Sequence, residues 1–117
     1  KKIVSISENS SMSELSSILI KSKMSGLPVI DKGGELVGFV SERDVITSLA
    51  QSSIMKKKVK DIMTKKVISV KKETSVEEIS KIFSEKSIRC LPVLDGGRLV
   101  GTILRKAVID RLLGYYY

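Results

Sequence analysis

Leu27-Pro28-Val29-Ile30-Asp31 and Leu91-Pro92-Val93-Leu94-Asp95 are two versions of one pentapeptide, 64 positions apart in a chain of 117 residues. Each is followed by a second shared stretch, Gly34-Glu35-Leu36-Val37-Gly38 in the first case and Gly97-Arg98-Leu99-Val100-Gly101 in the second. The chain therefore carries an internal duplication that contains both of its prolines. A duplication of this period predicts two copies of one small unit, each of which must pack to bury its apolar face.

The alignment of the two copies extends upstream without a gap. Ser11-x-x-Glu14 falls on Ser75-x-x-Glu78, and a hydroxyl followed three residues later by glutamate is typical of a helix start. Apolar residues follow at spacings of three and four, which predicts an amphipathic helix in each copy that ends before the proline. The aligned apolar positions are Met12, Leu15, Ile18, Leu19 and Met24 in the first copy, and Val76, Ile79, Ile82, Phe83 and Ile88 in the second.

The remaining elements complete the unit. A short strand over 67–70 precedes the helix, and a hairpin follows it, with glycines that permit the turn and with Asp31 and Asp95 as turn residues. A second helix closes each copy, over about 42–50 and 105–113. We therefore expect an α+β fold of order β-α-β-β-α, twice. Repeat 1 covers 1–50, a lysine-rich connector covers 51–60, and repeat 2 covers 61–117.

The composition excludes several classes of protein. The chain is 42% hydrophobic and 29% charged, which is typical of a folded domain. It has no run of about 18 apolar residues and no apolar leader, so we expect a cytoplasmic protein with no membrane partner. Histidine is absent and Cys90, an expected core residue, is the one cysteine, which excludes an internal disulfide, a Cys/His metal site and imidazole catalysis.

Two features of composition bear on source and partners. Asn9 and Gln51 are the only amide side chains, a scarcity reported for hyperthermophile proteins, so we expect a thermophilic archaeal source. Eight lysines lie between residues 56 and 72 against one acid, Asp61, in a chain of net charge +8. This run is interpreted as a solvated connector, a surface for polyanions, or part of a phosphate pocket. The alternative function is thus a basic nucleic-acid-binding protein, although no aromatic residue interleaves the lysines for stacking.

Taken in order, these motifs resemble a tandem pair of cystathionine beta-synthase (CBS) domains, the Bateman module. The likeness rests on the Leu-Pro-Val-apolar-Asp stretches, the Leu-Val-Gly that follows each turn, and Val59-Lys60-Asp61-Ile62-Met63-Thr64 between the copies. It covers essentially the whole chain. The resemblance implies two repeats packed as an intramolecular pseudo-two-fold pair. Because the counterpart of Asp61–Thr64 would fall just before Lys1, we expect the natural chain to start a few residues earlier.

The family's adenosine signature is a glycine, two apolar residues, Ser or Thr, two variable residues and Asp. Here it stands as Gly38-Phe39-Val40-Ser41-Glu42-Arg43-Asp44, called the signature below. The resemblance implies that Asp44 holds the ribose, that Ser41 holds the ribose or a phosphate, and that Arg43 grips a phosphate. Helix N-termini and guanidinium groups both attract phosphate. A competing interpretation is that Ser41 and Asp44 form only a helix-capping box.

The second copy lacks the signature. Leu104 and Ala107 stand where the first copy has Ser41 and Asp44, so we expect one competent pocket and one degenerate pocket. In this family the pocket is also lined by the first strand of the other copy. The resemblance therefore implies these further contacts from both copies: Ser25, Gly26, Phe39, Val40, Thr64, Val67, Ile68, Ile88 and Arg89. The competing interpretation is core packing for Phe39, Ile68 and Ile88, and an exposed charge before a strand for Arg89.

The resemblance implies a regulatory binding module and not an enzyme, with no catalytic residue and no metal. Its expected ligand is AMP, ADP, ATP or S-adenosylmethionine. The ligand would be held non-covalently in the cleft between the two repeats. Ligand binding would shift a conformational or oligomeric equilibrium that a regulated protein detects. Such modules associate through their helices, so we expect a homodimer. Core packing is the competing interpretation for the apolar helix positions that fit this surface, which are Val45, Ile46, Leu49, Val108, Ile109, Leu112 and Leu113.

Overall fold

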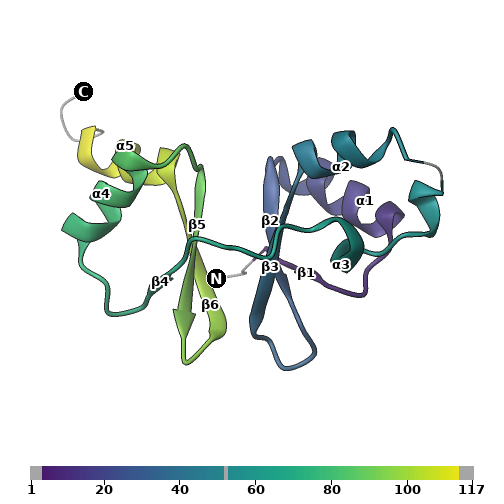
Figure 1. Ribbon diagram of the computed structural model, residues 1–117. Helices are drawn as coiled ribbons and strands as arrows, with labels where there is room; N and C mark the ends of the chain where they lie inside the picture. Colours follow the sequence, from purple (N-terminus) through teal and green to yellow (C-terminus); the bar gives the residue numbers. More distant parts are fainter. Residues whose placement is uncertain (1–3, 52, 114–117) are drawn as a thin grey trace. The chain divides into compact units, whose positions relative to one another are not determined.

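The computed structural model describes residues 4–51 and 53–113, with side chains as far as residue 109. By contacts the chain divides into two units, residues 1–67 and residues 68–117, and both are drawn in Figure 1. The first unit contains β1 (Ile6–Ser7), α1 (Met12–Ser22), β2 (Gly26–Ile30), β3 (Leu36–Ser41), α2 (Glu42–Ser48), the 3-10 helix η1 (Ile54–Lys56) and α3 (Val59–Ile62). The second contains β4 (Val70–Lys71), α4 (Val76–Glu85), β5 (Cys90–Asp95), β6 (Arg98–Leu104) and α5 (Arg105–Leu113).

Each unit is built on a three-stranded mixed sheet. β2 lies between β1, to which it is parallel, and β3, to which it is antiparallel, and β5 lies in the same way between β4 and β6. The registers correspond: Ile6 pairs with Val29 in the first sheet as Val70 pairs with Val93 in the second. Figure 1 shows both longer helices of each unit on one side of its sheet. The predicted duplication of a β-α-β-β-α unit is therefore confirmed.

The first strand of each unit is shorter than expected. We predicted a strand over 67–70, but only Val70 and Lys71 pair with β5. The prolines explain the correction. The Leu94 carbonyl accepts the Lys72 N–H at 3.0 Å, so residue 94, and with it Pro92 two residues earlier, turns its backbone groups toward β4. Proline has no N–H to donate, and the ladder stops there. β1 meets the same limit at Pro28.

Local chemistry at helix and turn positions matches the sequence. The Ser11 and Ser75 hydroxyls accept the N–H groups of Glu14 and Glu78, both at 3.1 Å, and start α1 and α4. In the second hairpin Gly96 and Gly97 have φ of 59° and 88°, the left-handed values that a two-residue turn requires. α2 ends at Ser48, slightly before the expected residue 50.

Both turn aspartates lie at their hairpins. Asp31 Oδ1 accepts the N–H groups of Gly33 and Glu35 at 2.9 and 3.0 Å. Asp95 pairs with Arg98 across the second turn and forms an exposed ion pair with Lys72 at 3.1 Å. Asp31 thus orders its turn directly, whereas Asp95 ties the second turn to the residue that follows β4.

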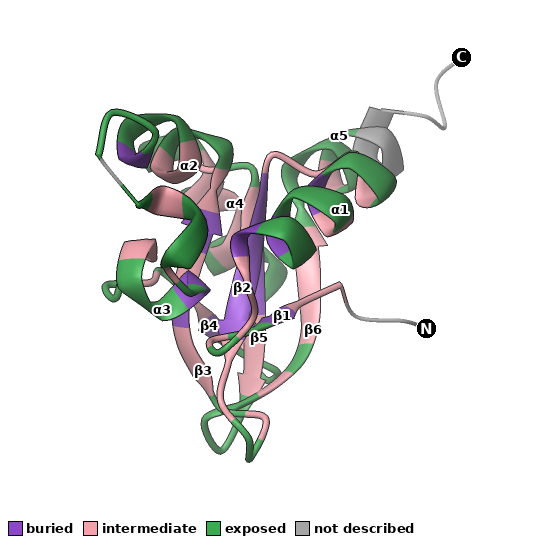
Figure 2. Cartoon of the chain, turned by 90° about the vertical axis from the view of Figure 1, so that its right-hand side faces the viewer, coloured by how far each residue is buried: buried purple, intermediate pink, exposed green. Residues whose placement is uncertain are grey.

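The core of the first unit includes a residue from the connector. Figure 2 shows β2 as a buried strand between its neighbours, and Val59 of α3 is fully buried with it. The backbone N–H groups of Val59 and Lys60 donate to the carbonyls of Ser10 and Glu8, both at 2.9 Å. By contacts the connector groups with the first unit, while the repeat limits 1–50, 51–60 and 61–117 stay a prediction. The buried apolar residues of the first unit are Ile6, Met12, Leu15, Leu19, Leu27, Val29, Val40 and Val59.

The second unit buries fewer side chains. Among its described residues, the fully or nearly fully buried ones are Val70, Leu91 and Pro92. Cys90, expected in the core, is half-buried, and burial raises the pKa of its thiol to about 11. Within residues 4–51 and 53–113 no helix has the length and apolar character needed to cross a bilayer.

Candidate functional site

The junction of β3 and α2 places Ser41 and Asp44 against each other. Ser41 is the N-cap of α2, and its hydroxyl accepts the Asp44 N–H at 3.2 Å. Asp44 Oδ2 in turn accepts the Ser41 N–H at 2.9 Å and the Ser41 hydroxyl at 3.1 Å. The structure thus contains the capping box that sequence analysis offered as the competing interpretation.

The capping box engages only one oxygen of the Asp44 carboxylate. Both bonds that this carboxylate accepts end on Oδ2, and among the described residues no hydrogen bond reaches Oδ1. The side chain is half-buried. A carboxylate oxygen has two lone pairs and accepts from hydroxyl groups. The arrangement can therefore start the helix and still offer an acceptor to a sugar hydroxyl.

A glycine and an aromatic ring lie beside this junction. The Glu42 N–H donates to the Ser25 carbonyl at 2.9 Å, which ties the start of α2 to the residue before β2. A Cβ on Gly26 would lie 2.5 Å from Phe39 Cε2, so the Phe39 ring occupies the space that any side chain at 26 would need. Val40 is fully buried. Ser25, Gly26 and Phe39 thus lie beside the capping box, with Val40 buried next to them, while their role as ligand contacts stays a prediction.

Thr64 joins the site from residues 61–66, which continue the predicted connector as far as the second unit; the connector is taken below as residues 51–66. It forms an isolated antiparallel bridge with Phe39, in which each residue's N–H donates to the other's carbonyl at 2.8 Å. Thr64 was a predicted contact, whereas the part played by Gly38 was not predicted: its absent Cβ leaves room for Met63 and Thr64. The signal was present, because the glycine begins the signature and the Met-Thr pair ends the motif between the copies.

The second unit repeats this backbone without its side chains. The Arg105 N–H donates to the Arg89 carbonyl at 2.9 Å, as Glu42 does to Ser25. Leu104 precedes α5 in the place of Ser41, and an aliphatic side chain cannot cap. The other predicted contacts are Val67 and Ile88, which are half-buried, Ile68, which is 39% exposed, and Arg89, which is exposed.

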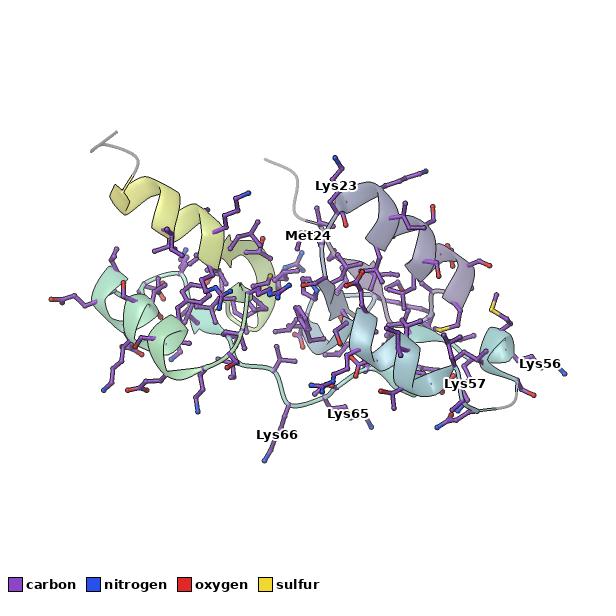
Figure 3. All side chains as sticks on the ribbon, turned by 90° about the horizontal axis from the view of Figure 1, so that it is seen from above. Lys23, Met24, Lys56, Lys57, Lys65 and Lys66 are labelled. Carbon is purple, nitrogen blue, oxygen red and sulfur yellow. The ribbon has the colours of Figure 1, made fainter. Side chains whose placement is uncertain are left out.

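The lysines of the run between residues 56 and 72 are exposed, apart from the half-buried Lys57. Arg43 lies on the first turn of α2 with an exposed side chain. Lys57 Nζ donates to Gln51 Oε1 at 2.7 Å, and Lys72 is paired with Asp95, which raises its pKa through a hydrogen bond and through charge attraction. Figure 3 shows Lys65 and Lys66 pointing outward from the connector. The lysine run is therefore partly engaged within the protein.

Comparison with known proteins matches the family described as CBS domain over residues 1–51 and 59–114. The L-aspartate semialdehyde sulfurtransferase of Methanocaldococcus jannaschii is 34% identical over 97% of this chain. The chain spans only 22% of that protein's length. This relative is archaeal, as are others that the comparison finds.

Solved structures agree in fold. The CBS domain pair of protein MJ0100, in complex with 5'-methylthioadenosine and S-adenosyl-L-methionine, is 33% identical with a TM-score of 0.81, covering 100% of this chain and 92% of that one. CBSX2 in complex with AMP is 28% identical with a TM-score of 0.84, covering 98% and 90%. Both similar structures hold an adenine-containing molecule.

Proposed function

Because this chain belongs to the CBS domain family and carries two repeats, we propose that it is a regulatory binding module that senses an adenine-containing ligand. The observation that carries the proposal is the half-satisfied carboxylate of Asp44: Oδ2 caps α2 while Oδ1 takes no hydrogen bond from the described residues. The adenine compounds named with the two similar structures support the ligand class. AMP, ADP, ATP and S-adenosylmethionine are the candidates.

In this proposal each residue of the site has a distinct role. Asp44 Oδ1 accepts from the ribose hydroxyls, and Ser41 contacts the ribose or a phosphate. Arg43 is exposed and supplies a two-point donor to a phosphate. The Phe39 ring, with Gly26 and Thr64, provides a wall that suits a flat base, and Val40, fully buried in the core, supports this wall from behind. The family resemblance adds Val67, Ile68, Ile88 and Arg89 as further contacts.

The module transmits a signal by population shift. A ligand with different affinities for two arrangements of the repeats changes their ratio, and a regulated protein responds to the favoured arrangement. We further propose that the chain forms a homodimer in the cytoplasm through exposed apolar residues of α2 and α5. Ile46, Leu49 and Ile109 are 67%, 59% and 48% exposed, while the side chains of Leu112 and Leu113 lie outside the described residues. In this proposal the site at the junction of β3 and α2 binds a ligand and does not catalyse a reaction.

The decisive experiment is calorimetric titration of the wild type and Asp44→Asn with the four candidate ligands at low and high salt. Asparagine can still accept the Ser41 N–H and so keep the cap, but its amide NH2 replaces an acceptor of the ribose. The wild type should bind about one ligand per chain with a roughly micromolar Kd, near −8 kcal/mol. Asp44→Asn should lose most of this affinity while its unfolding transition stays near that of the wild type.

Glu14→Gln is the matched control. Glu14 occupies the same place in the capping box of α1, where its Oε1 accepts the Ser11 N–H at 2.9 Å, and its substitution should leave ligand binding unchanged. Binding that survives Asp44→Asn and disappears at high salt would contradict the proposal. It would instead favour a polyanion at the lysine run, because phosphate-backbone contacts weaken steeply with ionic strength.

A further inference from the structure

Gly38 lies beside the isolated bridge that joins the connector to β3. The Phe39 N–H donates to the Thr64 carbonyl and the Thr64 N–H donates to the Phe39 carbonyl, both at 2.8 Å. These distances are at the short end of the range for N–H···O bonds. β3 is therefore held on one edge by β2 and on the other by Thr64.

This pairing requires that residue 38 have no side chain. A Cβ on Gly38 would lie 2.6 Å from Met63 Sδ and 2.9 Å from the Thr64 carbonyl oxygen. The methionine end could swing aside, but the carbonyl oxygen belongs to the backbone and is the atom that accepts the Phe39 N–H. Gly38 does not have a positive φ, so its backbone conformation suits any residue. Glycine is required at position 38 because the connector lies so close, and not because of the backbone conformation there.

The second unit supplies the comparison. Gly101 pairs with Val93 as Gly38 pairs with Val29, so the two glycines hold equivalent positions in equivalent sheets. A Cβ on Gly101 would meet only Val93 Cβ, at 4.0 Å, among the described atoms, which is ordinary contact. Among the described residues, the second unit therefore has room for alanine at this position, whereas Met63 and Thr64 fill the corresponding space beside Gly38.

We propose that Gly38 is a positioning residue that couples the connector to the ligand site, an inference that rests on the proposed function for its ligand. Phe39 carries the bridge to Thr64. Ser41 ends the same strand, separated from Phe39 by the fully buried Val40, and Asp44 lies in the first turn of the helix that follows. A ligand held by Ser41 and Asp44 stabilises the strand to which Thr64 is paired. Coupling of this kind is reciprocal, so loss of the bridge lowers the affinity for the ligand.

The test compares Gly38→Ala with Gly101→Ala by amide hydrogen exchange and by titration with AMP. Gly38→Ala should speed exchange at the Phe39 and Thr64 amides about tenfold, because both hydrogen bonds of the bridge are lost. Its AMP affinity should fall by about fivefold or more. AMP should slow exchange at Thr64 in the wild type and in Gly101→Ala, and should not slow it in Gly38→Ala. A merely structural role would not change this response to AMP.

Three outcomes separate the proposals. The inference is overturned if the Phe39 and Thr64 amides of Gly38→Ala exchange at the wild-type rate. It is also overturned if Gly38→Ala and Gly101→Ala change exchange and AMP affinity equally. If the wild type does not bind AMP, the proposed function fails for that ligand and the coupling fails with it, while the exchange rates still decide whether Gly38 positions the connector. If Gly38→Ala does not fold, Thr64→Pro replaces it, since proline removes the Thr64 N–H and leaves β3 intact. Unchanged exchange at Phe39 in that variant also overturns the inference.

Discussion

The first and second units pair their strands in the same register but fill equivalent positions with different side chains. Gly26 and Phe39 of the first unit correspond to Cys90 and Thr102 of the second. A small residue faces a large one in the first pair, and two residues of intermediate size replace them in the second. The sheet tolerates both solutions because the combined volume changes little.

The signature differs in another way. The second unit starts α5 with the same backbone bond that starts α2, although Leu104 and Ala107 cannot form a capping box. A helix can therefore start at this place in the unit without a capping box, as α5 does. The presence of Ser41 and Asp44 in one unit alone is a difference that folding leaves unexplained, which is why we connect them with a ligand.

The largest difference we expect between the units concerns their cores. Leu15 of α1 is fully buried, whereas its counterpart Ile79 of α4 is half-buried. Leu15→Ala should lower the free energy of unfolding by about 2–5 kcal/mol, because it removes buried methyl groups and leaves a cavity. Ile79→Ala should cost clearly less. Urea unfolding followed by circular dichroism measures both, and equal costs would show that the two helices are buried alike in solution.

The next largest effect is expected when one pair of residues in the first unit is replaced by its counterparts from the second unit. Gly26→Cys should destabilise the protein by about 1–3 kcal/mol, because its Cβ would overlap the Phe39 ring and force a shift. Adding Phe39→Thr should restore much of that loss, since this is the combination that the second unit uses. A double-mutant cycle of unfolding free energies tests the pair, with Phe39→Thr as the other single variant. Additive costs would mean that the two residues do not compensate each other.

The smallest effect is a pH dependence confined to the second unit. Burial raises the pKa of Cys90 from its ordinary value of 9.0 to about 11, so the folded state holds the thiol proton more tightly than the unfolded state. This contribution to stability is complete below pH 9 and is lost as pH rises toward 11. Unfolding free energies at pH 8 and pH 10.5 should therefore fall further in the wild type than in Cys90→Ala. An identical fall in both would place the titration elsewhere.

Several features followed from residues close together in the chain. The serine caps of α1 and α4, the glycine hairpin turn and the repeated sheet are consequences of local spacing and of the freedom of glycine, and these were predicted. Strand pairing brings Gly26, Phe39 and Val40 close together, but whether they contact a ligand stays a prediction. The same spacing could not decide between a capping box and a ribose acceptor at Ser41 and Asp44.

The sequence by itself determined the duplication, the order of elements and the difference between the two signatures, because periodicity, turn chemistry and capping depend on neighbours along the chain. Only the tertiary structure decided that Pro28 and Pro92 face the first strands and shorten them. Only it showed that Thr64 pairs with Phe39 and that Met63 and Thr64 leave no room for a side chain at Gly38. These properties depend on which backbone edge lies against which, and residues distant in sequence settle that through packing.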